Sequence, residues 1–109
     1  HTAECSVRRA AEAYYKALVL DPENYDYALK VGQTQTQIGD YDKALSAYAL
    51  CIKLKETASE PYRAVADIYV RQGRTDYALS ALSTGYDRTG NLDLFRAYEA
   101  MKAQGNAGE

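Results

Sequence analysis

The sequence predicts an all-α solenoid of five helices arranged in antiparallel pairs, and two observations carry this prediction. First, the stretch GDYDKALSAYALCIK at residues 39–53 recurs thirty-four residues downstream as GRTDYALSALSTGYD and thirty-four residues upstream as CSVRRAAEAYYKALV. Second, the matched columns within each copy are spaced i, i+4, i+7, which is one stripe of an α-helix. The chain is therefore predicted to hold three copies of one helical unit.

The columns of this repeat place a large side chain between two small ones. Three of them read Ala10, Ala44 and Ala78; Tyr14, Tyr48 and Leu82; Ala17, Cys51 and Gly85. Small residues on such a stripe let a second helix approach closely. A second helical stretch precedes each intact copy, with Gly32 and Ala66 in one shared column. Each unit is therefore predicted to be a helix, a turn and a helix.

This pattern resembles the tetratricopeptide repeat, a 34-residue helix-turn-helix family. The matching residues are Gly32, Gly39, Ala44, Tyr48 and Cys51 in one unit, and Ala66, Gly73, Ala78, Leu82 and Gly85 in the next. Asp21-Pro22 resembles the closing signature, whereas Glu56 and Gly90 replace the closing proline of the later units. The resemblance implies a right-handed superhelix of about two and a half repeats, acting as a non-catalytic scaffold for protein–protein interaction.

Taken in order, the first predicted element is a helix over residues 4–20, the second helix of a truncated repeat. Its alanines favour the helix and Asp21-Pro22 ends it. A full repeat over 25–58 follows, with Asn24 as the N-cap of helix 25–38, a turn at Gly39-Asp40 and a second helix over 41–54.

The next full repeat, residues 59–91, has helices over about 60–72 and 76–86, with Pro61 in the first turn of the former. A helix over 92–104 is predicted to cap the stack, and 105–109 to form a frayed tail. The capping helix has two candidate registers, because Leu94, Ala97, Tyr98 and Met101 form one apolar stripe whereas the 34-residue shift places the small residue at Ala100.

Composition bounds the class of protein. The 109 residues are one domain by length, and 47% hydrophobic with 26% charged residues is typical of a globular chain. No apolar run is long enough for a membrane span. A net charge of −2 argues against nucleic-acid binding, which depends on clustered Lys and Arg. The chain starts without Met and in mid-pattern, which is consistent with a fragment lacking its targeting segment, so the compartment stays open with a slight preference for the cytoplasm.

Catalytic chemistry has little support in the sequence. The one histidine is His1, so neither a metal cluster nor a Ser-His-Asp or Cys-His set can be built around a histidine. Two cysteines are too few for a disulfide scaffold, and Cys51 lies in a small-residue column. We therefore expect no catalytic residue, no metal and no cofactor.

Protein or peptide binding is better supported. In proteins similar to this family, the first helices of successive repeats line a concave surface that holds a peptide or a partner's helix. The faces opposite the packing stripes carry Asp26, Leu29, Lys30, Gln33, Thr36 and Gln37 on the first of these helices, and Glu60, Arg63, Asp67, Val70 and Arg71 on the second. The alternative interpretation of any one of these residues is the polar face of an amphipathic helix. The carboxylate clamp of chaperone-binding repeats is not reproduced, since Ala64 stands at one of its positions.

The alternative function is structural. The N-terminal helix is expected to lack its first-helix partner, which leaves Val7, Ala10, Tyr14 and Ala17 open to self-association or to packing on a missing upstream repeat. Tyrosine is also abundant, with eleven residues against one Phe. Four tyrosines fall on packing stripes and are expected in the core, namely Tyr14, Tyr48, Tyr62 and Tyr69. Four others are candidates for an aromatic contact patch, namely Tyr15, Tyr25, Tyr77 and Tyr86.

Overall fold

A computed structural model describes the backbone of residues 2–107 and the side chains of residues 5–104. The described chain is all helical, with α1 (Thr2–Leu20), α2 (Tyr25–Ile38), α3 (Tyr41–Leu54), α4 (Glu60–Arg71), α5 (Thr75–Thr89) and α6 (Leu92–Ala107). It divides between Lys55 and Glu56 into two compact units, the N-terminal unit with α1 to α3 and the C-terminal unit with α4 to α6. The all-α fold of antiparallel helix pairs is confirmed in each unit.

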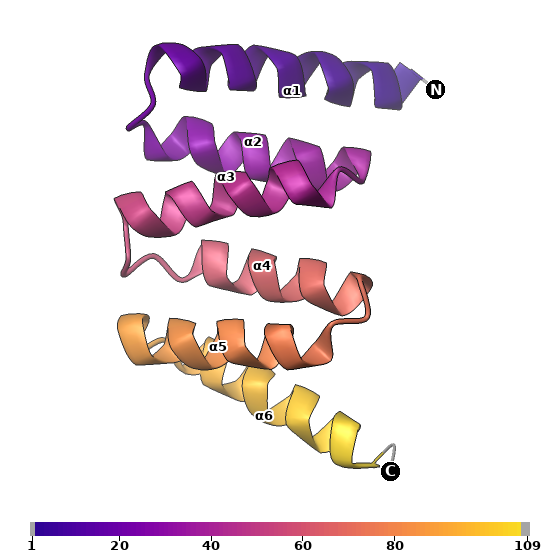
Figure 1. Cartoon of the computed structure of the whole chain (residues 1–109), viewed down its shortest axis with the longest axis vertical. Coiled ribbons are helices and arrows are strands. Elements are labelled where there is room, and N and C mark those ends of the chain that lie inside the picture. The colour runs from indigo at the N-terminus through magenta and orange to yellow at the C-terminus, as the bar shows by residue number, and fades with distance from the viewer. Residues whose placement is uncertain (1, 108–109) are drawn as a thin grey trace. The chain divides into compact units, whose positions relative to one another are not determined.

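The N-terminal unit is a row of three consecutive antiparallel helices, in which α1 packs on α2 and α2 packs on α3 (Figure 1). Asn24 caps α2 as predicted, since its side-chain oxygen accepts a hydrogen bond from the Tyr27 amide at 3.1 Å. Gly39 ends α2 in the left-handed conformation, with φ of 94°, and its amide donates to the carbonyls of Gln35 and Thr36. Asp40 then caps α3 by accepting from the Lys43 amide. The polar turn residues therefore set where each helix begins and ends.

The C-terminal unit repeats this plan with α4 packed on α5 and α5 packed on α6 (Figure 1). Pro61 lies in the first turn of α4, where its missing N–H leaves no helical hydrogen bond unmade. Asn91 joins the two ends of the unit: its side-chain oxygen accepts from the Asp93 amide at 2.8 Å, and its side-chain nitrogen donates to the Ser59 hydroxyl at 3.0 Å. The start of α6 is thereby tied to the start of α4.

Close helix packing depends on one glycine in each unit. A Cβ added to Gly32 on α2 would lie 2.7 Å from the ring of Tyr48 on α3, well inside van der Waals contact. A Cβ added to Gly85 on α5 would lie 2.8 Å from Cβ and Cγ of Tyr62 on α4. Tyr48 is 3% exposed and Tyr62 is 2% exposed. The expectation that Gly32 is kept because a facing helix needs the room is borne out by this contact.

Several expected boundaries need correction. The predicted count of five helices is wrong: the described residues form six, one for each of the six helical ranges that the sequence predicts. Helix α5 continues to Thr89 rather than Tyr86, since the residue that stops it is Gly90, with φ of 71°. Helix α6 continues to Ala107, three residues into the expected tail, where no proline interrupts it; residues 108–109 lie outside the described chain.

The packing of α6 follows the apolar stripe rather than the 34-residue shift. Leu94 is 2% exposed, and Ala97, Tyr98 and Met101 are half-buried, whereas Ala100 is exposed. The repeat spacing therefore does not extend to the last helix. Among the described helices α6 packs on α5, and Leu94 is its most buried residue.

Two of the four tyrosines expected in the core are not fully buried. Tyr48 and Tyr62 are buried, but Tyr14 and Tyr69 are half-buried. Tyr69 packs its ring at 5.4 Å from that of Tyr77, which is 58% exposed, so this aromatic pair lies at the edge of the α4–α5 contact. Tyr14 lies on α1, where no preceding helix is described to complete its cover.

Candidate binding surfaces

The first candidate surface is the α2 face that the sequence assigned to peptide binding. Asp26, Lys30 and Gln37 on this face are exposed, and Leu29, Gln33 and Thr36 are half-buried. The Thr36 hydroxyl donates to the Gly32 carbonyl at 2.7 Å, so it is engaged within its own helix. The groups that this face presents to a ligand are mainly the carboxylate of Asp26, the ammonium group of Lys30 and the side-chain amides of Gln33 and Gln37.

The second candidate surface is the matching face of α4, and all five of its predicted residues are exposed: Glu60, Arg63, Asp67, Val70 and Arg71. Arg63 Nε and Asp67 Oδ1 lie 3.5 Å apart in an i, i+4 ion pair, with side chains 53% and 59% exposed. Val70 is 47% exposed between these charges. The opposite side of α4 carries the buried Tyr62, Ala66 and Ile68. The α4 face therefore combines both signs of charge with one accessible aliphatic side chain.

These two faces belong to different units, and a groove shared by them stays a prediction. One face consists of residues of α2 and the other of residues of α4. The chain thus offers two separate polar helix faces, either of which could contact a peptide by itself.

The third candidate surface is the α1 stripe, defined by Val7, Ala10, Tyr14 and Ala17. All four of these residues are half-buried. The part of α1 that faces α2 is centred elsewhere, on Ala11 at 2% exposure and Leu18 at 9%. The counterparts of the stripe in α3 are far more enclosed, with Ala44 and Cys51 at 0% and Tyr48 at 3%. Self-association through this stripe stays a prediction.

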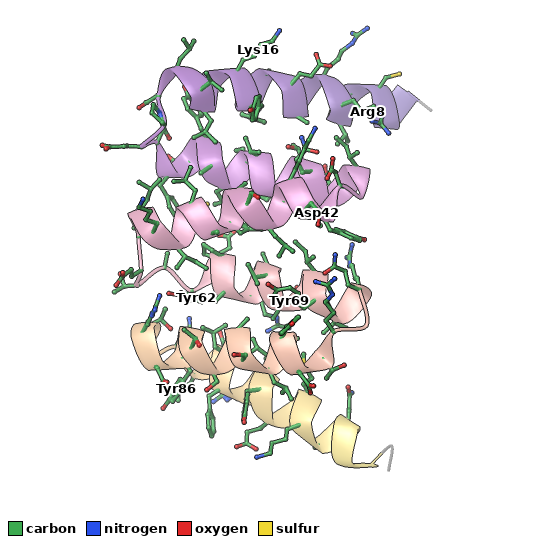
Figure 2. The ribbon with its side chains drawn as sticks, viewed as in Figure 1. Arg8, Lys16, Asp42, Tyr62, Tyr69 and Tyr86 are labelled. Carbon is green, nitrogen blue, oxygen red and sulfur yellow. The ribbon has the colours of Figure 1, made fainter. Side chains whose placement is uncertain are left out.

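A cleft of about 720 Å³ opens in the N-terminal unit between α1 and α3, and α2 contributes to its lining. Apolar side chains line much of it, from all three helices: Ala11, Tyr15, Leu18, Val31, Ile38, Ala47 and Leu50. Charged side chains from α1 and from the start of α3 line it too, among them Arg8, Glu12, Asp42 and Lys43, and Figure 2 shows Arg8 and Asp42 toward the same end of their helices. Lys43 is paired with Asp40 at 3.8 Å.

This cleft was not anticipated, and among the residues predicted for binding only Tyr15, a candidate for an aromatic contact patch, lines it. The residues of α2 that do so are Val31, Gln35 and Ile38, which the sequence assigned to helix packing. A signal was present in α1, where Ala11, Tyr15 and Leu18 are spaced i, i+4, i+7. The prediction for α1 rests on the alanine and tyrosine columns of the repeat, and this second stripe lies outside them.

The C-terminal unit contains one electrostatic feature of note. The Tyr62 hydroxyl donates to the Glu56 carbonyl at 3.1 Å and accepts from Arg88 Nη1 at 3.5 Å, which fastens the segment before α4 to α5 (Figure 2). The hydrogen bond to Tyr62 raises the pKa of Arg88. These two hydrogen bonds hold the start of α4.

Within the described residues, no group of three or more His, Cys, Asp or Glu side chains is placed to hold a metal ion. Within the described side chains, Cys5 is exposed and Cys51 is buried, and neither forms a disulfide. The helices of the described chain all fall short of the length and apolar character that crossing a bilayer requires.

Comparison with known proteins identifies the fold. The structure is similar to that of TTC0263, a thermophilic tetratricopeptide-repeat protein of Thermus thermophilus, with a TM-score of 0.77 and 24% identity over 89% of this chain and 50% of that one. It is also similar to two crystal structures of MamA. One has a TM-score of 0.75 and 22% identity over 94% of this chain and 57% of MamA. The other has a TM-score of 0.72 and 24% identity over 76% of this chain and 48% of MamA.

The chain thus spans about half the length of these structural neighbours. No family model matches it, and no curated protein matches it either. At these identities the likeness concerns the fold alone, and the conclusion it supports is that the chain has a tetratricopeptide-like fold of helical repeats.

Proposed function

We propose that this protein is a non-catalytic interaction module that binds a peptide segment of a partner protein through the α4 face, with the α2 face as a second, separate surface of the same kind. The exposed α4 face carries the proposal: Arg63, Asp67 and Arg71 share it with Val70, on a helix whose other side is core. A tetratricopeptide-like fold is compatible with this role, since it displays such helix faces from a rigid core and provides no catalytic group of its own.

The charges of the α4 face are suited to recognition rather than to stability. An ion pair with both partners more than half exposed contributes about 0.2–1 kcal/mol, so Arg63 and Asp67 can exchange each other for groups of a ligand at little cost. Val70 offers a small apolar contact beside them. The ligand that fits is an extended peptide with mixed charges and at least one aliphatic side chain.

The test is selection from a displayed peptide library on the immobilised chain, followed by titration of the enriched peptide. Changing Arg63, Asp67 and Arg71 together to Ala should weaken binding by at least about tenfold, which is roughly 1.4 kcal/mol. The matched control changes Asp93, Arg96 and Lys102 of α6 to Ala, which removes the same numbers of acidic and basic groups and should leave the affinity within about twofold. Equal affinity of both triple variants for the peptide would refute the α4 face.

A further inference from the structure

The cleft of the N-terminal unit is separate from the three candidate helix surfaces. Its walls are α1 and α3 and its floor is α2, all within one unit. It shares no residue with the α1 stripe, the α2 face or the α4 face. Its volume of about 720 Å³ lies within the range of ligand pockets, which is about 300–1,000 Å³. The cleft therefore has the size of a binding site and takes no part in the proposed function.

One buried polar side chain lines the floor of the cleft without a partner. Gln35 on α2 is 9% exposed, and its side-chain amide makes no hydrogen bond among the described residues. This amide is not sealed in the core, because Gln72 Oε1 is the one fully enclosed side-chain atom of the described chain that lacks a partner. The accessible part of Gln35 therefore opens to the cleft. A buried amide without a hydrogen bond lowers stability, so an apolar residue would serve the fold better at this position.

The amide of Gln35 matches the backbone of an extended peptide. A carboxamide holds a hydrogen-bond donor and an acceptor side by side. One residue of an extended strand presents its N–H and its C=O toward the same neighbour, as the paired residues of an antiparallel sheet do. A helix does not offer this pair, because its N–H and C=O groups are bonded within the helix. The ligand that satisfies Gln35 is therefore an extended segment of backbone.

The two ends of the cleft differ in chemistry. Leu18 of α1 and Leu50 of α3 line one end. Arg8 and Glu12 of α1 and Asp42 of α3 line the other (Figure 2). The α1 wall from residue 8 to residue 18 is about 15 Å long, since a helix rises about 1.5 Å per residue. About five residues of extended chain cover this length, so one short peptide reaches both ends.

Acidic groups prevail at the charged end. Lys43 is already paired with Asp40 at 3.8 Å. Of the three charges that remain, Glu12 and Asp42 are carboxylates and Arg8 is a guanidinium. None of these three has an ion-pair partner among the described side chains. The surplus carboxylate favours a cationic group in the ligand.

We propose that the cleft binds an extended peptide segment of a partner protein, about five residues long, whose backbone pairs with the Gln35 amide. A Lys or Arg side chain of the segment lies at the end with Glu12 and Asp42. Large aliphatic side chains of the segment lie at the end with Leu18 and Leu50. Alternate side chains of an extended chain point to the same side, so the basic residue and two aliphatic residues are two positions apart from one another.

Four capped pentapeptides test this chemistry. Acetyl-Lys-Thr-Leu-Thr-Leu-amide has the proposed pattern, and acetyl-Leu-Thr-Leu-Thr-Lys-amide tests the opposite chain direction. In the third peptide Glu replaces the Lys of the tighter-binding order, and in the fourth Asn replaces both Leu. Titrated into the isotope-labelled full chain, the tighter-binding Lys peptide should bind at least about fivefold more tightly than the Glu peptide and about tenfold more tightly than the Asn peptide. The amide shifts should map to the residues that line the cleft.

Replacing Gln35 by Leu separates a role in binding from a role in the fold. Gln35→Leu should raise the melting temperature, because an apolar side chain of similar size replaces an unpartnered amide, and it should weaken the Lys peptide at least about fivefold. N-methylation of the central Leu of the peptide removes a backbone N–H. It should weaken binding to the unaltered chain at least about fivefold and binding to Gln35→Leu by less than about twofold. A lower melting temperature with unchanged peptide affinity would assign the amide to the fold and overturn the proposal.

Asp42→Asn tests the charged end, and the repeat supplies its matched control. Asp42→Asn should reduce the preference for the Lys peptide over the Glu peptide at least about threefold. Asp76→Asn removes the same charge from the same repeat column in the C-terminal unit, and it should change this preference by less than about 1.5-fold. Equal effects of the two variants would assign the preference to the net charge of the chain and contradict a cationic site at the cleft.

The proposal fails if neither order of the Lys peptide shifts the cleft amides at about 5 mM, or if the Lys and Glu peptides bind equally tightly. Shifts confined to α4 would give the peptide to the α4 face and overturn the cleft as its site. The triple variant of Arg63, Asp67 and Arg71 should keep its affinity for the Lys peptide within about twofold. Failure at the cleft is thus distinguishable from failure of the α4 face, whose test uses different residues and a different peptide.

Discussion

The two units bury the same columns with opposite distributions of volume. In the α2–α3 pair of the N-terminal unit, the glycine is Gly32 on α2 and the tyrosine is Tyr48 on α3. In the α4–α5 pair of the C-terminal unit the order is reversed, with Tyr62 on α4 and Gly85 on α5. Both pairs are buried. The repeat therefore keeps the summed volume of the two facing side chains constant. A core is packed to a fixed density, so a tyrosine ring on one helix requires a residue without a side chain on the facing helix.

The largest expected effect comes from removing the aromatic side of one pair. Tyr62→Ala should lower the free energy of unfolding by about 3–5 kcal/mol in urea denaturation, since it deletes a buried ring. Gly85→Cys alone should also destabilise, but added to Tyr62→Ala it should recover at least about 1 kcal/mol, because the pair then matches Ala28 and Cys51 of the other unit. Leu94, whose methyl lies 2.9 Å from the new Cβ, is the flexible end that has to shift. If the losses of unfolding free energy of the two single variants simply add in the double variant, the two units do not exchange side-chain volume between the same pair of columns.

Gly85→Ala tests the glycine side of the same pair. Alanine is the better helix former by about 1 kcal/mol, so propensity by itself predicts a gain in stability. The new Cβ would lie 2.8 Å from Cβ and Cγ of Tyr62, and that Cβ moves only with the backbone of α4, so we expect a net loss of about 1–3 kcal/mol. The melting temperature of this variant decides between the two, and a rise would contradict the close approach.

The capping asparagines extend the comparison to the turns. Asn24→Ala should cost about 1 kcal/mol by removing the α2 cap. Asn91→Ala should cost about 1–2 kcal/mol, since it removes the bond to the Asp93 amide and also the bond to Ser59 across the unit. Ser59→Ala should reproduce only the second part. Equal losses for the two asparagines would mean that the bridge between the starts of α4 and α6 adds nothing.

The smallest effect is expected at the surface ion pairs. Arg63→Ala should change the free energy of unfolding by less than about 0.5 kcal/mol, because both members of its pair with Asp67 are more than half exposed. Arg96→Ala, whose pair with Asp93 is 3.7 Å long and more exposed still, is the matched comparison. Denaturation at low and high salt measures both. A loss above about 1 kcal/mol at Arg63 alone would give this residue a structural role and weaken its assignment to ligand binding.

Most of the fold could be predicted from the sequence because the repeat columns and the turn residues agree. Asn24, Gly39 and Pro61 set helix limits through local backbone chemistry, which depends little on the rest of the molecule. The predicted end of α5 at Tyr86 is too early, because the helix continues to Thr89 and is closed by Gly90 in the left-handed conformation. The sequence offered two registers for α6, because the apolar stripe and the 34-residue shift disagree there, and the packing follows the stripe with Leu94.

The candidate sites were predictable only in part. The exposure of Arg63 and Asp67 follows from their position opposite a packing stripe, and the helical periodicity of the sequence is enough to predict that position. The cleft beside α1 was missed because it depends on how far α1 and α3 stand apart, with Tyr15 and Leu18 along one side. That separation comes from side-chain volumes across three helices, and a one-dimensional pattern does not contain it.

A double-mutant cycle on Gly32 and Tyr48 tests the exchange of volume between facing helices most directly. We predict that Gly32→Ala and Tyr48→Leu each lower the free energy of unfolding, the first by overpacking and the second by leaving a void. Together they should lose at least about 1 kcal/mol less than the sum of the two, because the double variant has the Ala66 and Leu82 pair of the C-terminal unit. The account would be contradicted if the double variant lost as much free energy of unfolding as the two single variants together, or more.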